Sequence, residues 1–498
     1  MDELKDASIH HTAIKISNEI KNMKLYGQLY KTVQKLVCSP DVNKDNIKST
    51  LQVAILANGL DTDIRNIVYH LIRSTLKNEF KSTGLSSDHL NYLRRAGIQW
   101  ERRVRKSLCN MCNEMQVTLQ GQPRISVDKE ELLNKWNELS NYQIDLSSYR
   151  PVYAPKDLLE VLLSLKGPQR QEDDLHPKWE FSHIGLPVKK IYDLRMHFLD
   201  LIRNEKTTNW SLQCQKVLQK RHAPLCQHLL KRGQTPTQYR GAFWSYVLGS
   251  HVEQYDQDHW DKLKLSVLNT DLIVDKLIFK DVQLTATNDD QYFVFEDVLY
   301  QVMLCFSRDT EINQIINQDV VNNSKTKQYD GPPSVVPFHG ICMFAAPFCY
   351  LFDSPVKLYF TFRAFYIRYC HRLTTINTHP QGIVSLCLLF EKLLQTHEPE
   401  LWSHFREIQI QPIRIVFKWL MRAFSGHLPP DELLILWDLI LGFDSLEIIP
   451  LLAIVILSFR KESLMQVETL ENIEAVLADL SSIKVLPLLQ LALTTNRD

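Results

Sequence analysis

The sequence contains no glycine-rich phosphate loop. Neither the GxxxxGK[ST] pattern of P-loop enzymes nor the GxGxxG pattern of dinucleotide-binding folds occurs in its 498 residues. The GxSxG turn of serine hydrolases and the HExxH helix of zinc proteases are also missing. A chain without these patterns is not expected to bind and cleave a nucleotide by itself. Any nucleotide on which it acts must be held by another protein.

An excess of charge of one sign is absent too. Lys and Arg together number 57, and so do Asp and Glu, so no long-range field draws the molecule toward nucleic acid or an anionic membrane. Long apolar runs are also missing. The longest, residues 340–352 and 448–459, are shorter than the ~18–20 residues that cross a bilayer, and the second contains Pro450. Both are predicted to be buried helices.

The N-terminal sequence MDELKDASIHH lacks the basic and apolar regions of a signal peptide and the Arg-rich character of a transit peptide. The ten cysteines are scattered, and several lie in apolar stretches, as reduced core thiols do: Cys342, Cys349, Cys370 and Cys387. We therefore expect a protein of the cytoplasm.

Helical periodicity dominates the N-terminal part. Apolar residues recur three and four positions apart in residues 16–37, in residues 46–80 with a break at Gly59, and in residues 88–115, followed by a shorter stretch at 129–139. These stretches predict a helical N-terminal module over residues 1–140. Residues 141–205 change composition and predict a connector with one short helix at 157–165.

From about residue 206 the helical periodicity returns and continues almost to the end of the chain. Alternating β-branched runs are scarce and no internal repeat is evident, so an all-α fold is predicted, with a helical bundle followed by a second helical domain at residues 206–490.

Residue types that bind metals gather at two places. Cys109 and Cys112 form a CxxC pair, and Cys226 and His228 lie near His222. A second ligand pair at zinc spacing is missing, so packed thiols are the favoured interpretation and no metal is expected. The basic run at 102–106 could contact phosphate or an acidic partner. The favoured interpretation is that it forms the solvated face of a helix.

Four segments follow one another after residue 206: 240–244 (RGAFW), 278–285 (IFKDVQLT), 336–347 (VPFHGICMFAAP) and 417–438, which begins FKW, passes through HLP and ends in WD. They resemble, in order, the RGxxW, IxxDxxRT, YCQGM-AAP and LP-WD blocks of the TBC family of Rab GTPase-activating proteins. Residues 131–138, 149–157 and 289–297 resemble one member of that family in particular, so the likeness covers nearly the whole chain.

The resemblance implies an all-α, two-lobed TBC domain that binds a Rab-family small GTPase. It gives structural roles to Arg240, Gly241, Trp244, Trp437 and Asp438. The partner would hold GTP and magnesium, so no cofactor is expected on this chain, and no nucleic acid is expected as a ligand. It further implies a regulator of membrane trafficking that reaches a membrane through its partner; the oligomeric state stays open.

Both catalytic positions of the family are substituted. In TBC domains an arginine of the IxxDxxR block neutralises charge on the γ-phosphate, and a glutamine of the YCQG block orients the attacking water. Leu284 and His339 stand at these positions. An aliphatic side chain cannot replace a guanidinium, whereas a neutral imidazole still accepts or donates a hydrogen bond. Asp281 and Gly340 remain and are expected in the GTPase-binding groove.

Arg308, at the end of an apolar helix, is the candidate replacement for the missing arginine, although a cation that complements the helix dipole is the favoured interpretation. Three hypotheses follow. The chain is a Rab GTPase-activating protein with a non-standard set of catalytic residues, a Rab-binding adaptor without efficient catalysis, or a helical scaffold that no longer recognises GTPases. Binding and acceleration of hydrolysis distinguish the three.

Overall fold

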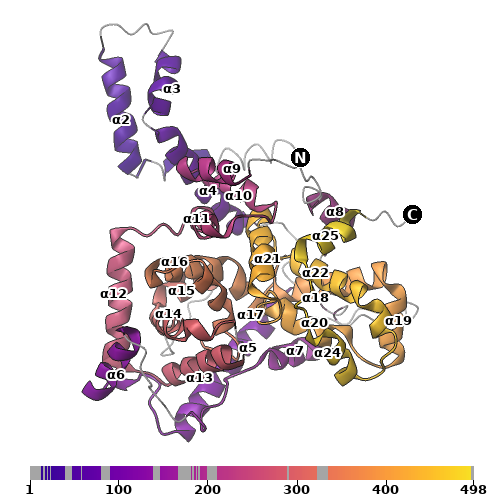
Figure 1. The fold of residues 1–498 in the computed structure, drawn as a ribbon. Coiled ribbons are helices and arrows are strands. Elements are labelled where there is room, and N and C mark those ends of the chain that lie inside the picture. The colour runs from indigo at the N-terminus through magenta and orange to yellow at the C-terminus, as the bar shows by residue number, and fades with distance from the viewer. Residues whose placement is uncertain are drawn as a thin grey trace. The chain divides into compact units, whose positions relative to one another are not determined.

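The part of the chain that the computed structural model describes is mostly helical, with two very short strands (Figure 1). The chain divides into two compact units, residues 1–85 with 207–229, and residues 86–206 with 230–498. The domain boundaries predicted at 140 and 205 do not coincide with this division. The structure describes residues 13–14, 17–18, 21–22, 24–39, 47–57, 59–79, 90–137, 146–165, 181, 184, 186, 188, 191–198, 210–288, 291–321 and 335–494.

The smaller unit contains α2 (Lys24–Val37), α3 (Ile47–Ala57), α4 (Leu60–Glu79), α9 (Trp210–Gln219) and most of α10 (Ala223–Leu230). The predicted break at Gly59 is confirmed, since Gly59 has a φ of 71° and separates α3 from α4. Asn66 of α4 joins distant parts of this unit. Its side chain donates to the Arg221 carbonyl at 2.7 Å and accepts from the Ala223 amide at 2.9 Å, which fixes the start of α10.

The first part of the larger unit contains α5 (Asn91–Glu114), β1 (Gln122–Pro123), α6 (Ser126–Asn137), α7 (Pro155–Ser164), α8 (Ile191–Phe198), α11 (Thr237–Leu248), α12 (Gln254–Asn269), β2 (Thr270–Asp271), α13 (Ile273–Asn288), η4 (Phe293–Phe295), α14 (Glu296–Arg308) and α15 (Thr310–Val321). The two short strands pair antiparallel, with Gln122 opposite Asp271.

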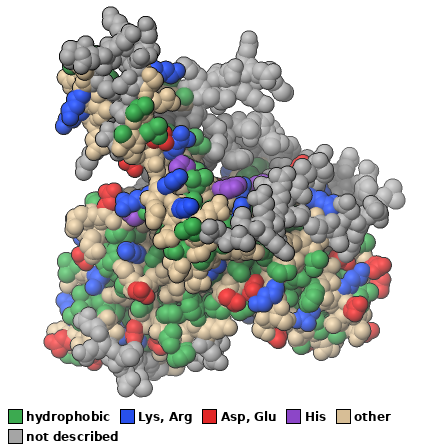
Figure 2. Space-filling model, turned by 45° about the horizontal axis from the view of Figure 1, so that its top comes forward, with side chains coloured by type: hydrophobic (Ala, Val, Ile, Leu, Met, Phe, Trp, Pro, Cys, Tyr) green, Lys and Arg blue, Asp and Glu red, His purple; other side chains and the backbone are tan. Residues whose placement is uncertain are grey.

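The rest of this unit contains η5 (Cys342–Phe344), η6 (Ala346–Tyr350), α16 (Pro355–Phe365), η7 (Tyr366–Cys370), α17 (His371–Thr374), α18 (Ile383–His397), α19 (Pro399–Glu407), α20 (Pro412–Met421), α21 (Pro430–Phe443), α22 (Ile448–Phe459), α23 (Lys461–Leu464), α24 (Leu470–Ala478) and α25 (Val485–Thr494). The all-α prediction is confirmed. Figure 2 shows acidic, basic and apolar side chains interspersed over the described surface in that view, as the balanced composition implies.

The two long apolar runs have different outcomes. Residues 448–459 form the buried helix α22, as predicted. Residues 340–352 do not form a helix: they make the short 3-10 turns η5 and η6, because Gly340 has a φ of 94° and Pro347 lacks an N–H to donate. Among the described residues, no helix combines the length and apolar character that a membrane crossing requires.

The core of the larger unit joins the first and last sequence blocks. Trp244 of α11 and Trp437 of α21 are fully buried, with ring centroids 6.2 Å apart. The next residue, Asp438, accepts hydrogen bonds from Trp244 Nε1 at 2.6 Å and from Arg240 Nε at 3.0 Å. Gly241 leaves no room for a side chain, because a Cβ there would lie 2.8 Å from the Leu351 carbonyl oxygen. These residues therefore hold α11 against α21.

Helices α5 and α7 belong to this core rather than to a separate N-terminal module. Trp100 of α5 packs edge-on against Tyr153, whose ring stacks on Phe338 with centroids 5.1 Å apart. Helix α7 lies against α20 (Figure 1). Lys280 of α13 donates to the Leu146 carbonyl at 3.2 Å. Apolar burial and backbone hydrogen bonds thus attach residues 146–164 to the helices that carry the candidate site.

Candidate functional site

Asp281 of α13 connects two parts of the predicted groove. Its carboxylate accepts the Gly340 amide at 2.6 Å on one oxygen and the Cys342 amide at 2.9 Å on the other. The side chain is only 6% exposed, so both hydrogen bonds lie in a setting where water cannot easily replace them. Asp281 therefore fixes the backbone of residues 339–342, which we call the His339 loop.

Gly340 is required by the shape of this loop. Its φ of 94° disfavours any residue with a side chain. A Cβ at this position would also lie 2.3 Å from the NH2 nitrogen of Arg422. The sequence therefore keeps glycine where the guanidinium of Arg422 lies directly against the loop backbone.

His339 presents one edge of its ring to solvent. Its backbone amide donates to the Tyr153 carbonyl at 3.0 Å, while its side chain is 40% exposed. Nδ1 is buried without a hydrogen-bond partner and lies 3.7 Å from Asp281 Oδ1, slightly beyond hydrogen-bond distance. The exposed part of the ring is consequently the edge that carries Nε2.

The surroundings favour the neutral form of His339. Burial lowers the pKa of His339 below its usual value, Asp281 opposes this, and Arg422 and Lys418 add to the lowering. At neutral pH the ring is therefore uncharged, with one nitrogen that donates and one that accepts. It can take either role toward a water molecule.

Leu284 lies three residues after Asp281 and therefore on the same face of α13. Its side chain is half-buried and offers no polar atom. The position predicted for a catalytic arginine thus shares a helix face with Asp281, which braces the His339 loop, but contributes neither charge nor a hydrogen bond.

Arg308 is committed elsewhere. Its two terminal nitrogens each lie 2.7 Å from an oxygen of Asp275, and NH2 also donates to the Thr270 carbonyl at 2.9 Å. Asp275 lies nine residues before Leu284, about 13 Å along the axis of α13 at 1.5 Å per residue. The structure therefore does not bring Arg308 to Leu284 or His339.

One basic residue that the sequence analysis did not select lies at the His339 loop, and a histidine lies near it. Arg422 donates through NH2 to the His339 carbonyl at 3.1 Å. His427 is close to Arg422, and burial, followed by Arg422 and Lys418, lowers its pKa to about 3. Both flank a turn inside the segment that the TBC resemblance treats only as a fold marker. No local sequence pattern marks the contact of Arg422 with the loop, because the two lie far apart in the sequence.

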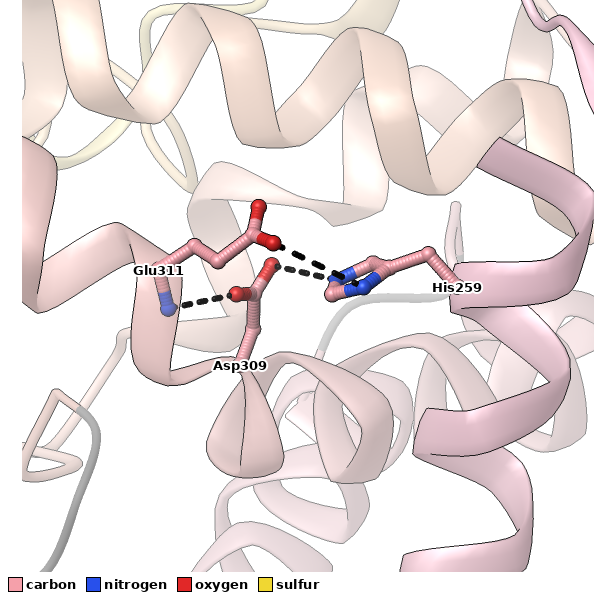
Figure 3. Close-up of side chains that lie close together, drawn as sticks. All are labelled: His259, Asp309 and Glu311. Carbon is pink, nitrogen blue, oxygen red and sulfur yellow. Dashed lines mark hydrogen bonds and ion pairs between the residues drawn. The ribbon is translucent and has the colours of Figure 1, made fainter. Parts of the chain in front are cut away.

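One other cluster has ligand types suited to a metal. Single donor atoms of His259, Asp309 and Glu311 lie within 4.8 Å of one another, the one such group among the described residues (Figure 3). Arg363 already bridges the two carboxylates at 2.6 and 2.8 Å. Burial alone would raise the pKa of Asp309, but Arg363 and the Tyr359 hydroxyl hold it below its usual value. The guanidinium thus occupies the place that a cation would take.

The predicted cysteine pair is divided by burial. Cys109 is exposed and Cys112 is buried on α5, and Cys226 is buried on α10. Burial raises the pKa of Cys112 and raises that of Cys226 to about 12. Both thiols are therefore protonated groups packed in the core.

The known proteins that this chain matches contain TBC domains. The family model for the Rab-GTPase-TBC domain matches residues 334–465. Human TBC1 domain family member 19 is 41% identical over 520 aligned positions, covering 96% of each protein. The TBC domain-containing protein kinase-like protein of Dictyostelium discoideum is 33% identical over 106 positions, 21% of this chain and 10% of that protein.

Two solved structures also match. The Chlamydomonas flagellar RabGAP TBC domain covers 61% of this chain and 90% of its own, with 13% identity and a TM-score of 0.40. The Ypt/Rab-GAP domain of Gyp1p covers 61% of this chain and 97% of its own, with 12% identity and a TM-score of 0.40.

Proposed function

This chain belongs to the TBC family of Rab GTPase-activating proteins, and we propose that it binds a GTP-loaded Rab and accelerates hydrolysis through His339 in place of the usual glutamine. The observation that carries this proposal is the His339 loop, whose backbone amides donate to Asp281 and whose His339 ring is partly exposed to solvent. Two hydrogen bonds to one buried carboxylate stabilise the loop in this arrangement.

A Rab GTPase holds GTP and magnesium itself but hydrolyses slowly, because negative charge on the γ-phosphate is poorly stabilised and the attacking water is loosely held. A GTPase-activating protein corrects both deficits. His339 addresses the second. Its neutral ring can accept a hydrogen bond from the water through Nε2 when Nδ1 carries the proton and faces Asp281.

The missing arginine of α13 sets the expected size of the effect. An arginine supplied to a GTPase contributes roughly 10³–10⁵ in rate. Since Leu284 supplies nothing of this kind, we propose that acceleration through the family positions alone is much weaker than that of a TBC domain with both catalytic residues. The alternative favoured by Leu284 is an adaptor that binds a Rab without accelerating hydrolysis.

The cellular setting follows from the same proposal. The Rab would supply GTP and magnesium, so the chain itself would need no cofactor. We propose that it acts in the cytoplasm in membrane trafficking and reaches its membrane through the Rab.

The test is single-turnover GTP hydrolysis over a panel of purified Rabs, with binding to each GTP-loaded Rab recorded in the same samples. The proposal predicts at least one Rab that both binds and hydrolyses faster with the chain than alone. Binding without acceleration would identify an adaptor, and neither binding nor acceleration would identify a scaffold. Both of these results would reject the proposal.

A further inference from the structure

Arg422 is a half-buried cation without a carboxylate partner among the residues that the structure describes. Its NH2 donates to the His339 carbonyl, and its Nε is buried with no hydrogen-bond partner. By contrast, Arg240 lies 3.0 Å from a carboxylate oxygen and Arg363 lies 2.6 Å from one. Removing a guanidinium from water without pairing it is costly, so an anion that arrives from outside would stabilise such a group.

The position of the guanidinium is defined by its contact with Gly340. A Cβ built on Gly340 would lie 2.3 Å from NH2, 2.5 Å from Cζ and 2.7 Å from Nε of Arg422, so the whole planar group lies against this residue. Gly340 follows His339, the residue proposed to hold the attacking water. The guanidinium is therefore beside the place where hydrolysis would occur.

The turn that follows Arg422 holds it there. Arg422 caps α20, and the next two residues, Ala423 and Phe424, have φ values of 47° and 63°. Left-handed backbone at two successive residues with side chains is costly and persists only where the surroundings impose it. Trp437 Nε1 donates to the Ala423 carbonyl at 3.0 Å, which helps to impose it. Strain of this kind gathers at functional sites.

The charges around Arg422 leave it free to meet a phosphate. Asp281 is the carboxylate whose charge acts on it, yet both Asp281 oxygens already accept backbone amides of the His339 loop. Lys418 adds a second positive charge nearby, while burial keeps His427 neutral. Two cations and one anion leave this corner of the site with a positive balance.

We propose that Arg422 supplies the positive charge that Leu284 lacks, and that it contacts the γ-phosphoryl group of the partner's GTP during hydrolysis. This inference rests on the proposed GTPase activation. In that reaction the water oxygen bonds to the γ-phosphorus while the bond to the β–γ bridging oxygen breaks. Its electron pair stays on GDP, and the proton lost by water ends on phosphate or in solvent. Arg422 forms no covalent bond.

The experiment compares Arg422→Gln with Arg414→Gln, which makes the same change on an exposed residue of α20. Hydrolysis is measured in single turnover with the Rab that the wild-type chain accelerates. We expect Arg422→Gln to lower the rate by about 10²–10³, the usual effect of removing one group that stabilises charge in a transition state. Arg414→Gln should keep the wild-type rate.

Two further readouts separate a catalytic role from a structural one. The affinity of Arg422→Gln for a Rab loaded with a non-hydrolysable GTP analogue should differ from that of the wild type by less than about threefold. The complex with GDP-loaded Rab and aluminium fluoride, which mimics the transition state, should be lost. A structural role would weaken both complexes together.

If thermal unfolding shows that Arg422→Gln does not fold, Arg422→Lys is used in its place to test the catalytic role. It should fold, bind and hydrolyse about tenfold more slowly, because lysine lacks the planar fork.

The outcomes are distinct. If the wild-type chain accelerates no Rab in the panel, the proposed function and this inference both fall. If the wild type accelerates hydrolysis and the Arg422 variant accelerates it equally well, the proposed function stands and the role of Arg422 is rejected. The Arg422 variant here is Arg422→Gln, or Arg422→Lys where the first does not fold. Loss of rate in step with loss of GTP-state binding also rejects it.

Discussion

Replacing Asp281 with alanine tests whether one carboxylate determines the shape of the His339 loop. The carboxylate accepts the Gly340 amide at 2.6 Å and the Cys342 amide at 2.9 Å while almost fully enclosed. Alanine removes both acceptors and leaves two backbone N–H groups without partners. The loop must then either keep them unsatisfied or open to water.

The expected cost follows from these two hydrogen bonds. A hydrogen bond to a charged group contributes about 1.5–3 kcal/mol, so the pair contributes up to about 6 kcal/mol if nothing relaxes. The loop is near the surface, where water can reach part of it after a small movement. We therefore expect Asp281→Ala to make local opening of the loop easier by about 3 kcal/mol.

Hydrogen exchange of peptides that cover residues 338–344 measures this directly, since the two-unit chain need not unfold in a single step. A change of 3 kcal/mol is about a 10²-fold faster exchange at the two amides, at 1.4 kcal/mol per factor of ten. Asp261→Ala, on the exposed face of α12, is the matched control and should leave the exchange of these peptides unchanged. Exchange at wild-type rates in Asp281→Ala would refute the bracing role.

Three other predictions concern catalysis and the core. Leu284→Arg should raise single-turnover hydrolysis at least about tenfold with a Rab that binds, and an unchanged rate would show that this face of α13 does not meet the γ-phosphate. The hydrolysis rate with the wild-type chain, corrected at each pH for the rate of the Rab alone, should stay level from pH 8 to below pH 6.5. It should fall only at lower pH, where His339 gains a proton because its pKa is lowered. A fall that begins above pH 6.5 would contradict the assignment of a neutral imidazole. Asp438→Ala should cost about 3–5 kcal/mol in urea unfolding of the larger unit, because it leaves the buried Arg240 guanidinium without its carboxylate; a loss below 1 kcal/mol would show that this pair is not needed.

The fold was largely accessible from the sequence. Helical periodicity predicted α3, α4 and α5 to within a few residues, because each has a regular apolar face. It failed at residues 340–352, where hydrophobicity suggested a helix. There the backbone follows the positive φ of Gly340 and the hydrogen bonds to Asp281, and neither leaves a periodic signal in the sequence.

The candidate site was only partly accessible. The family resemblance selected Asp281, His339 and Gly340, and the structure brings these three together. Arg422 was missed because its role depends on a contact with Gly340 across 82 positions of sequence, for which no local pattern exists. Arg308 was proposed from its place at the end of an apolar helix, yet its partner Asp275 holds it near the start of α13, away from Leu284.

The most direct test of the central claim is single-turnover GTP hydrolysis by a Rab that binds the chain, comparing the wild type with His339→Ala and His339→Gln. The account predicts that wild-type chain accelerates hydrolysis, that His339→Ala loses about 10²-fold or more of that acceleration while still binding, and that His339→Gln retains it. Acceleration by His339→Ala equal to that of the wild type would contradict the account.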